Sequence, residues 1–185
     1  MKVVAFAASS SKNSINKKLV TYAAGLLRNV EVEILDLNDY ELPLFSVDRE
    51  VQLGHPPLAK DFFDKITQSD GLIISFAEHN GAYTAAYKNL FDWCSRIDSK
   101  VFQNKPMVLL ATSPGARGAS TVLGIATASA PHFGGCVKAS VSVPSFMENF
   151  DEISGTITNP ELRVQLENAV NCLLKGRLET AGNKG

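Results

Sequence analysis

A serine-rich turn carries the strongest chemical signal in the sequence. Ser9, Ser10, Ser11 and Ser14 lie close together, and a helical pattern follows them directly. A helix start offers free backbone N–H groups and the positive end of the helix dipole, and the hydroxyls and the Lys12 ammonium would add further donors. The turn lacks the G-x-G-x-x-G of dinucleotide sites and the G-K-[ST] of nucleotide triphosphatases. It therefore predicts a site for a terminal phosphate monoester.

The same turn has a simpler interpretation as a helix N-cap. Ser14, preceded by Asn13 and followed three residues later by Lys17, could satisfy N–H groups that the first helical turn leaves without partners. A cap needs one hydroxyl, and the turn has several. This excess favours phosphate binding over capping alone, while capping by Ser14 stays open.

A second polar loop follows the apolar run that ends at Phe76. Asn80 and Gly81 both tolerate positive φ, so this dipeptide predicts a tight turn. With Glu78 and His79, the loop offers side-chain and backbone groups that could hydrogen-bond the edge of a planar heterocycle. The alternative is an ordinary turn between a strand and a helix, and this loop alone does not decide between the two.

A third loop, residues 112–119, contains two glycines and an arginine. Gly115 and Gly118 would let the backbone approach a flat ring closely. Arg117 could meet a cofactor phosphate or face solvent. In an open, doubly wound parallel sheet, ligands bind beyond the carboxyl ends of the strands where the strand order reverses. The three loops are therefore expected to meet at one site.

Five apolar runs, separated by stretches of helical length, predict the elements that position these loops. Nearly continuous apolar runs are typical of parallel strands covered on both faces, whereas the alternation in residues 31–36 is typical of an edge strand. We expect an α/β fold with helices on both faces of a five-stranded parallel sheet. The expected strands are Val3–Ala7, Val30–Leu35, Gly71–Phe76, Met107–Ala111 and Val137–Val143.

The expected helix from Tyr83 to Ile97 has an unusually wide apolar stripe, so it is expected to bury two faces. One face would contact a partner helix in a dimer, unless a loop of the same chain covers Tyr87, Phe91 and Trp93. The other expected helices span residues 15–26, 58–66, 119–133 and 160–178.

The remaining stretches are expected to be irregular. Residues 42–57 and 143–159 are rich in turn-forming residues and predict long surface loops. The tail, residues 181–185, is small and polar and is expected to be frayed. Residues 1–180 are expected to form one domain.

Composition argues against several classes of partner and site. Lys and Arg total 18 against 19 Asp and Glu, a net charge of -1, which disfavours nucleic acid and anionic membranes as partners. Cys94, Cys136 and Cys172 form no disulfide framework and are expected to be buried thiols in a reducing compartment. The histidines form no metal-ligand pattern, so no metal site is expected. No apolar run reaches the ~20 residues of a membrane span, and the chain begins with a strand-like segment rather than a signal peptide, so a cytoplasmic location is expected.

The three loops together resemble those of the NAD(P)H-dependent FMN reductases, flavodoxin-like flavoenzymes that include quinone and azo-dye reductases. The family's first loop reads roughly G-S-x-R-x-x-S-x-N-x-x-L, which Ser9, Ser14, Asn16 and Leu19 match. Its second reads roughly P-E-Y-N-G-x-x-P followed by K-N-x-x-D-W, where this chain has A-E-H-N-G-A-Y-T and K-N-L-F-D-W. Its third, S-x-G-G-x-G, is similar to residues 113–118. The resemblance spans nearly the whole chain.

The chain also departs from this pattern. Ser11 stands where many members carry arginine, with Lys12 beside it as a substitute cation, and Ala77 and Thr84 replace prolines. His79 replaces a tyrosine expected close to the flavin. It is a candidate proton donor near the ring, although a structural hydrogen bond would explain it equally well. Substrate preference is therefore not carried over.

The resemblance implies a three-layer sandwich with strand order 2-1-3-4-5, FMN as cofactor and NADPH or NADH as co-substrate. A hydride would pass to the flavin, and electrons would then pass to a small acceptor such as a quinone, a flavin or an azo dye. The flavin carries this chemistry, so no side chain is assigned as catalytic. The cofactor-binding residues are expected to be Ser9, Ser11, Lys12, Ser14, Ile15, Asn16, Ala77, Glu78, His79, Asn80, Gly81, Ser113 and Gly115.

Two further expectations follow from the resemblance. Similar family members are homodimers or homotetramers, which implies a homo-oligomer here. The alternative function is that of a flavodoxin-type FMN-binding electron carrier without NAD(P)H turnover. Such carriers tend to be strongly acidic, whereas this chain carries a net charge of only -1.

Overall fold

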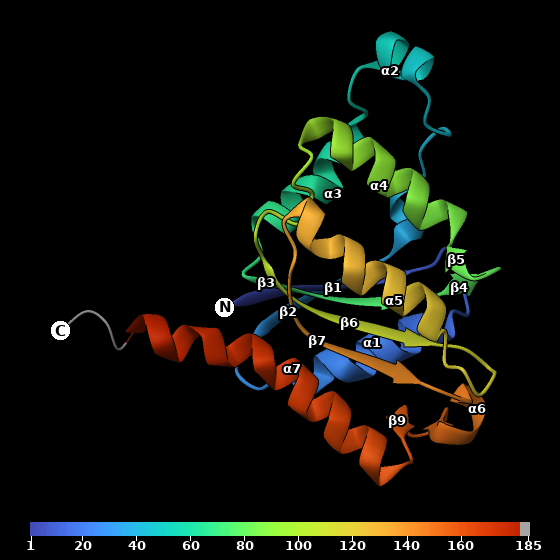
Figure 1. Ribbon diagram of the computed structural model, residues 1–185, viewed down its shortest axis with the longest axis vertical. Helices are drawn as coiled ribbons and strands as arrows, with labels where there is room; N and C mark the ends of the chain where they lie inside the picture. The colour runs from blue at the N-terminus through green and yellow to red at the C-terminus, as the bar shows by residue number, and fades with distance from the viewer. Residues whose placement is uncertain (182–185) are drawn as a thin grey trace.

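Five parallel strands form the central sheet of the computed structural model, which describes residues 1–181 (Figure 1). Val3 lies opposite Val32 on one side and Gly71 on the other, so the chain reverses its winding direction beside the first strand. The predicted order 2-1-3-4-5 is confirmed. Across the sheet the strands are β2 (Glu31–Leu35), β1 (Lys2–Ala8), β3 (Gly71–Phe76), β6 (Pro106–Thr112) and β7 (Cys136–Val143).

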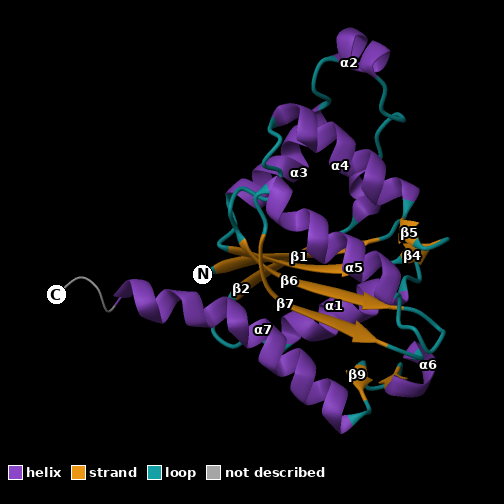
Figure 2. Cartoon of the chain, viewed as in Figure 1, coloured by secondary structure: helices purple, strands orange, loops and turns teal. Residues whose placement is uncertain are grey.

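Helices cover both faces of the sheet and complete a three-layer sandwich (Figure 2). One layer contains α1 (Ile15–Gly25) and α7 (Pro160–Ala181), and the other contains α3 (Pro57–Thr67), α4 (Ala85–Ile97) and α5 (Ser120–Ser129). Alternating side chains of β1 supply both cores: Val3 and Ala5 pack in the α1 and α7 layer, and Val4 and Phe6 in the other. Burial on both faces explains why the central strands have nearly continuous apolar sequences.

Strand β2 lies at the edge of the sheet, as its alternation predicted. Leu35 is buried in the core on the α3 side, whereas Val32 packs against the core on the α1 side. Ile34 remains 41% exposed, in keeping with the edge position of its strand. The edge position brings the charged residues of β2 within reach of β1 and α3.

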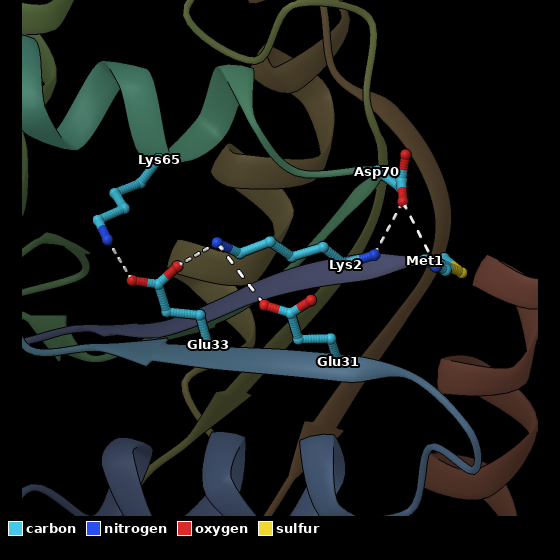
Figure 3. Close-up of polar contacts among 6 residues, drawn as sticks. All are labelled: Met1, Lys2, Glu31, Glu33, Lys65 and Asp70. Atoms are coloured by element: carbon cyan, nitrogen blue, oxygen red, sulfur yellow. Dashed lines mark hydrogen bonds and ion pairs between the residues drawn. The ribbon is translucent and has the colours of Figure 1, made fainter.

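A chain of ion pairs joins β2 to its neighbours (Figure 3). The Glu33 carboxylate lies 2.8 Å from Lys2 Nζ on β1 and also bonds Lys65 Nζ on α3. Hydrogen bonds from Lys2 and then Lys65 hold the pKa of Glu33 below its ordinary value, against the opposing effect of burial. At the same end of β1, Asp70 Oδ2 accepts the backbone N–H of Lys2 at 2.8 Å.

Replacing Glu33 by Gln is expected to destabilise the fold at pH 7 and to have less effect in acid. A carboxyl whose pKa is lowered by folding contributes stability above its unfolded pKa, and this contribution is lost as the pH falls through the folded value. Solvent screens the pairs, so the loss in unfolding free energy at pH 7 should stay below about 1 kcal/mol. Urea denaturation of E33Q and wild type at pH 7 and at pH 3 measures it.

Glu31→Gln is the control, because Glu31 is more exposed and its carboxylate lies 4.0 Å from Lys2 Nζ. It should change the unfolding free energy less than E33Q does at pH 7. Equal stability of E33Q and wild type at pH 7 would show that the Glu33 pairs contribute nothing to the fold.

The two predicted surface loops contain short elements. Residues 42–57 include α2 (Val47–Leu53), a projecting helix with no buried residue, and residues 143–159 include α6 (Phe146–Asn149), β8 (Phe150–Asp151) and β9 (Thr156–Ile157). The prediction of purely irregular loops was wrong. Local hydrogen bonding accounts for α2, whose N-cap Ser46 accepts the N–H of Arg49 at 3.2 Å.

Other boundaries differ by a few residues. The predicted helix at 119–133 divides into α5 and the 3-10 helix η2 (Ala130–Phe133), which contains a proline, and a second 3-10 helix, η1 (Leu37–Tyr40), follows β2. Of the tail predicted to be frayed, Ala181 ends α7 and residues 182–185 lie outside the described residues.

Other residues of the same chain cover most of the wide apolar stripe of α4. Trp93 Nε1 donates to the Pro43 carbonyl at 2.7 Å, and its ring meets Phe45 edge-on at 5.1 Å. Covering by residues 42–45 is therefore confirmed for Trp93. Tyr87 packs instead against Phe6 and Phe76 of the sheet, and Phe91 packs against Phe102, which follows α4, and Phe133 in η2.

The cysteines occupy three different environments. Cys94 is buried in α4, and burial raises the pKa of its thiol to about 12. Cys172 is partly exposed, and Cys136 is exposed, so the prediction of three buried thiols was wrong. Cys136 is the first residue of an edge strand, where fewer neighbours cover a side chain. Within residues 1–181, no helix has the length and apolar character needed to cross a membrane.

Candidate functional site

The three predicted loops meet beyond the carboxyl ends of β1, β3 and β6, around a pocket of about 240 Å³. Its lining residues are Ser9, Ser11, Asn13, Ser14, Ile15, Asn16, Ala77, Glu78, His79, Thr112, Ser113 and Pro114. Among the residues predicted from sequence, Lys12, Asn80, Gly81 and Gly115 lie outside this lining. Asn13, Thr112 and Pro114 were not predicted, although they flank residues that were.

The serine-rich turn caps α1 and leaves several hydrogen-bond donors free, and we call this set of free donors the cradle. Ser14 is the N-cap of α1, and its Oγ accepts the N–H of Lys17 at 3.3 Å, so the capping interpretation is confirmed. Ser9 Oγ similarly accepts the N–H of Ser11 at 3.2 Å. Both hydroxyls use only acceptor capacity in these bonds and retain an O–H donor. Within residues 1–181, no hydrogen bond engages the backbone N–H groups of Ile15 and Asn16.

The side chain of Asn16 points into the protein and ties the turn to the sheet. Its Oδ1 accepts the hydroxyl of Ser75 at 2.7 Å and the N–H of Thr112 at 3.1 Å, while Nδ2 donates to the Thr112 carbonyl at 3.1 Å. All three residues are essentially buried. The prediction that Asn16 contacts a phosphate therefore rests on its backbone N–H. We call these three hydrogen bonds the Asn16 clamp. In the sequence, Ser75 and Thr112 are polar residues near the ends of apolar strands, and this pattern is the feature from which the clamp could have been expected.

Replacing Asn16 by Ala is expected to lower the unfolding free energy by about 2 kcal/mol, because buried polar groups of Ser75 and Thr112 would lose their partners. Thermal or urea denaturation of the apoprotein measures the loss. Asn13→Ala is the matched control: Asn13 is exposed in the same turn, and its side chain makes no hydrogen bond with residues 1–181. If N16A were as stable as N13A, the clamp would have no structural role.

The second loop is a two-stranded hairpin formed by β4 (Glu78–His79) and β5 (Ala82–Tyr83). Asn80 and Gly81 form its tip with φ values of 52° and 77°, so the predicted turn is confirmed. Two consecutive positive φ angles are the geometry of the tight hairpin turns that Asn-Gly favours. His79 is exposed at the pocket.

Thr84 fixes the base of the hairpin to the end of β1, where the serine-rich turn begins. Its hydroxyl donates to the Ala8 carbonyl at 3.0 Å and accepts the N–H of Tyr87 at 3.2 Å, which caps α4. The proline of the family pattern has no hydroxyl for either bond. This departure from the pattern therefore adds a buried link between the ends of β1 and β5.

The third loop is pressed against β7. Gly118 has a φ of +56°, and a Cβ at this position would lie 2.3 Å from Ser142 Oγ and 2.9 Å from the Pro144 nitrogen. Both glycines were expected to lie against a ring, but the close approach of Gly118 is to the neighbouring strand. A Cβ at Gly115 would meet open space. Arg117 is exposed.

Charged side chains of both signs lie near the cradle, and the Glu78 carboxylate lines the same pocket. Lys17 on α1 pairs with Asp36 after β2, and the hydrogen bond from Lys17 is the main reason that the pKa of Asp36 lies below its ordinary value. Lys12 is exposed at the tip of the turn and makes no ion pair with residues 1–181. The described residues contain no group of three His, Cys, Asp or Glu side chains placed to hold a metal ion. Hydroxyls, free N–H groups and one ammonium suit a phosphate.

Comparison with known proteins gives one matching family model and relatives with related names. The family model described as NADPH-dependent FMN reductase matches residues 1–147. An NADPH:quinone oxidoreductase of Arabidopsis thaliana is 30% identical over 119 residues, 62% of this chain and 59% of that protein. An NAD(P)H-dependent FMN reductase of Pseudomonas aeruginosa is 30% identical over 116 residues, 62% of this chain and 61% of that protein. The chain thus aligns with about three fifths of each relative.

Solved structures share the fold. The flavoenzyme FerB, an NAD(P)H:(acceptor) oxidoreductase from Paracoccus denitrificans, superposes with a TM-score of 0.75 at 24% identity, covering 94% of this chain and 95% of its own. The apo form of an NADH:FMN oxidoreductase, EMOB, superposes with a TM-score of 0.67 at 19% identity, covering 94% and 89%. At these identities the likeness concerns architecture.

Proposed function

The chain belongs to the NADPH-dependent FMN reductase family, and we propose that it is an NAD(P)H-dependent oxidoreductase with FMN as its cofactor. Its acceptor would be a small molecule such as a quinone, a flavin or an azo dye. The observation that carries the proposal is the pocket at which the anion cradle of α1 meets the loops after β3 and β6. A cradle for a monophosphate beside two loops suited to a flat ring matches the two ends of FMN.

The cradle would hold the FMN phosphate through three kinds of donor. Ile15 and Asn16 offer backbone N–H groups, Ser9 and Ser14 offer hydroxyl protons, and Lys12 adds a positive charge. Ser11 lines the same pocket. Helix α1 directs its positive end toward this point, which strengthens each bond to an anion.

The other two loops would hold the ring. We assign to it the hairpin residues Ala77, Glu78, His79, Asn80 and Gly81, with Ser113 and Gly115 on the third loop. Bound FMN would supply the hydride-accepting chemistry, so the chain itself needs no nucleophile or general acid. The protein's task is to fix the two ends of the cofactor and to leave room for substrates at the pocket mouth, where His79 is exposed.

Purification under mild conditions tests the proposal. The protein should be yellow, or should become so on reconstitution with FMN, and NADPH or NADH added without oxygen should bleach the colour. Colour that persists with both nucleotides would contradict the reductase. Failure to bind FMN after reconstitution would contradict flavin binding altogether.

Replacing Ser14 by Ala is expected to raise the Kd for FMN by about tenfold, because one donor to the phosphate is lost. The Kd for riboflavin, which has no phosphate, should change much less. Fluorescence titration of the apoprotein with both ligands measures the difference. Ser46→Ala is the matched control, since Ser46 caps α2 in the same way but lies outside the lining of the pocket. An equal loss of affinity for both ligands would place the phosphate elsewhere.

We further propose that the protein is a homodimer or homotetramer built on α4 and α5. A second pocket, of about 220 Å³, lies between these helices, and its lining is rich in apolar side chains such as Phe91 and Phe133. Ile125 lines it while 42% exposed. We call this second pocket the groove between α4 and α5. Covering the groove by a second copy of the chain would remove apolar surface from water.

Replacing Ile125 by Asp is expected to shift the protein toward monomer, because a charge would be buried in the apolar contact. Sedimentation velocity over a range of concentrations measures the shift, with Val164→Asp on the exposed surface of α7 as control. A wild-type protein that is monomeric at high concentration would contradict the proposed assembly.

We also propose a cytoplasmic location. The support comes from the cysteines, which are three in number and widely spaced in the sequence. Such usage is typical of proteins in reducing compartments.

A further inference from the structure

Helix α5 begins without a cap of its own. Ala119, at its N-cap position, adopts the left-handed conformation at φ 59°, and its methyl side chain cannot accept a hydrogen bond. The residues immediately before it form the loop that lines the pocket at Ser113 and Pro114. The position of this loop therefore depends on how the start of α5 is held.

A carboxylate from a distant part of the chain supplies the missing cap. Glu78 Oε2 accepts the backbone N–H of Val122, in the first turn of α5, at 2.9 Å. Glu78 belongs to β4 and itself lines the pocket. A carboxylate at a helix N-terminus also interacts favourably with the helix dipole. One side chain thus joins the hairpin to the helix that directly follows the third loop.

A second bond fixes the same hairpin to the far end of α5. The hydroxyl of Tyr83 on β5 lies 3.1 Å from Ser129 Oγ, in the last residue of the helix. The hairpin is therefore attached to α5 at both ends. Glu78 makes the attachment on the side of the pocket, whereas Tyr83 lines the groove between α4 and α5.

We infer that Glu78 is a positioning residue for the flavin site, which acts by capping α5 and so setting the gap between hairpin β4–β5 and the loop after β6. The inference rests on the proposed function, because it assigns the ring to that gap. It predicts that the hydrogen bond to Val122, rather than the negative charge of Glu78, is what cofactor binding requires. Gln retains an oxygen that can accept this bond, and Ala does not.

The test compares E78A and E78Q as full-length apoproteins. E78A is expected to raise the Kd for FMN on the order of tenfold, and E78Q to restore it to within about twofold of wild type. Amide hydrogen exchange at Val122, measured without FMN, should speed up in E78A and return toward the wild-type rate in E78Q. This second readout reports the cap even if E78A is too unstable for titration.

Asn159→Ala is the matched control. Asn159 Oδ1 accepts the N–H groups of Glu161 and Leu162 at the start of α7 and takes no part in the pocket lining. N159A should lower the melting temperature and leave the Kd for FMN unchanged. Wild-type affinity in E78A, or E78Q as weak as E78A, would overturn the inference. A wild-type protein that binds no FMN would instead overturn the proposed function, while Val122 exchange would still test the cap.

Discussion

The side chain of Asn16 is the constraint on which the rest of the site depends. Its amide pairs with both backbone groups of Thr112 and accepts the hydroxyl of Ser75, so the first turn of α1 is held against the ends of β3 and β6. Because these bonds are buried, breaking them would leave polar groups without water. The cradle is thereby fixed relative to the two loops that follow those strands, and a ligand can contact all three at once.

The same polar groups that start the helices also shape the site. Ser14 caps α1, Thr84 caps α4, and Glu78 caps α5, and each of them lies in a loop at the carboxyl edge of the sheet. A capping oxygen uses its lone pairs, so a serine hydroxyl keeps its proton for a ligand. Stability of the helix starts and affinity for an anion are therefore compatible. The cap at Ser14 therefore leaves room for the proposed phosphate site in the same turn.

Sequence patterns predicted the central strands correctly, because segments that are apolar on both faces must be covered on both faces. The strands around Val4, Ile73 and Leu109 are almost continuously apolar, and a central parallel sheet covers them on both faces. Patterns were less reliable for short elements such as α2, whose ends are set by local hydrogen bonds rather than by an apolar stripe. They also misplaced Cys136, because exposure at a strand end depends on its neighbours.

The sequence by itself determined the turn at Asn80 and Gly81 through its local chemistry, and the strand order through the motifs of the family resemblance. It left the cap at Ser14 open, and the structure shows that cap. Only the tertiary structure decided where the side chains of Asn16 and Glu78 point. Their partners lie 96 and 44 residues away, on elements that the fold brings alongside. The spacing of residues along the chain does not predict such contacts, because the partners come together only when the strands have assembled into the sheet.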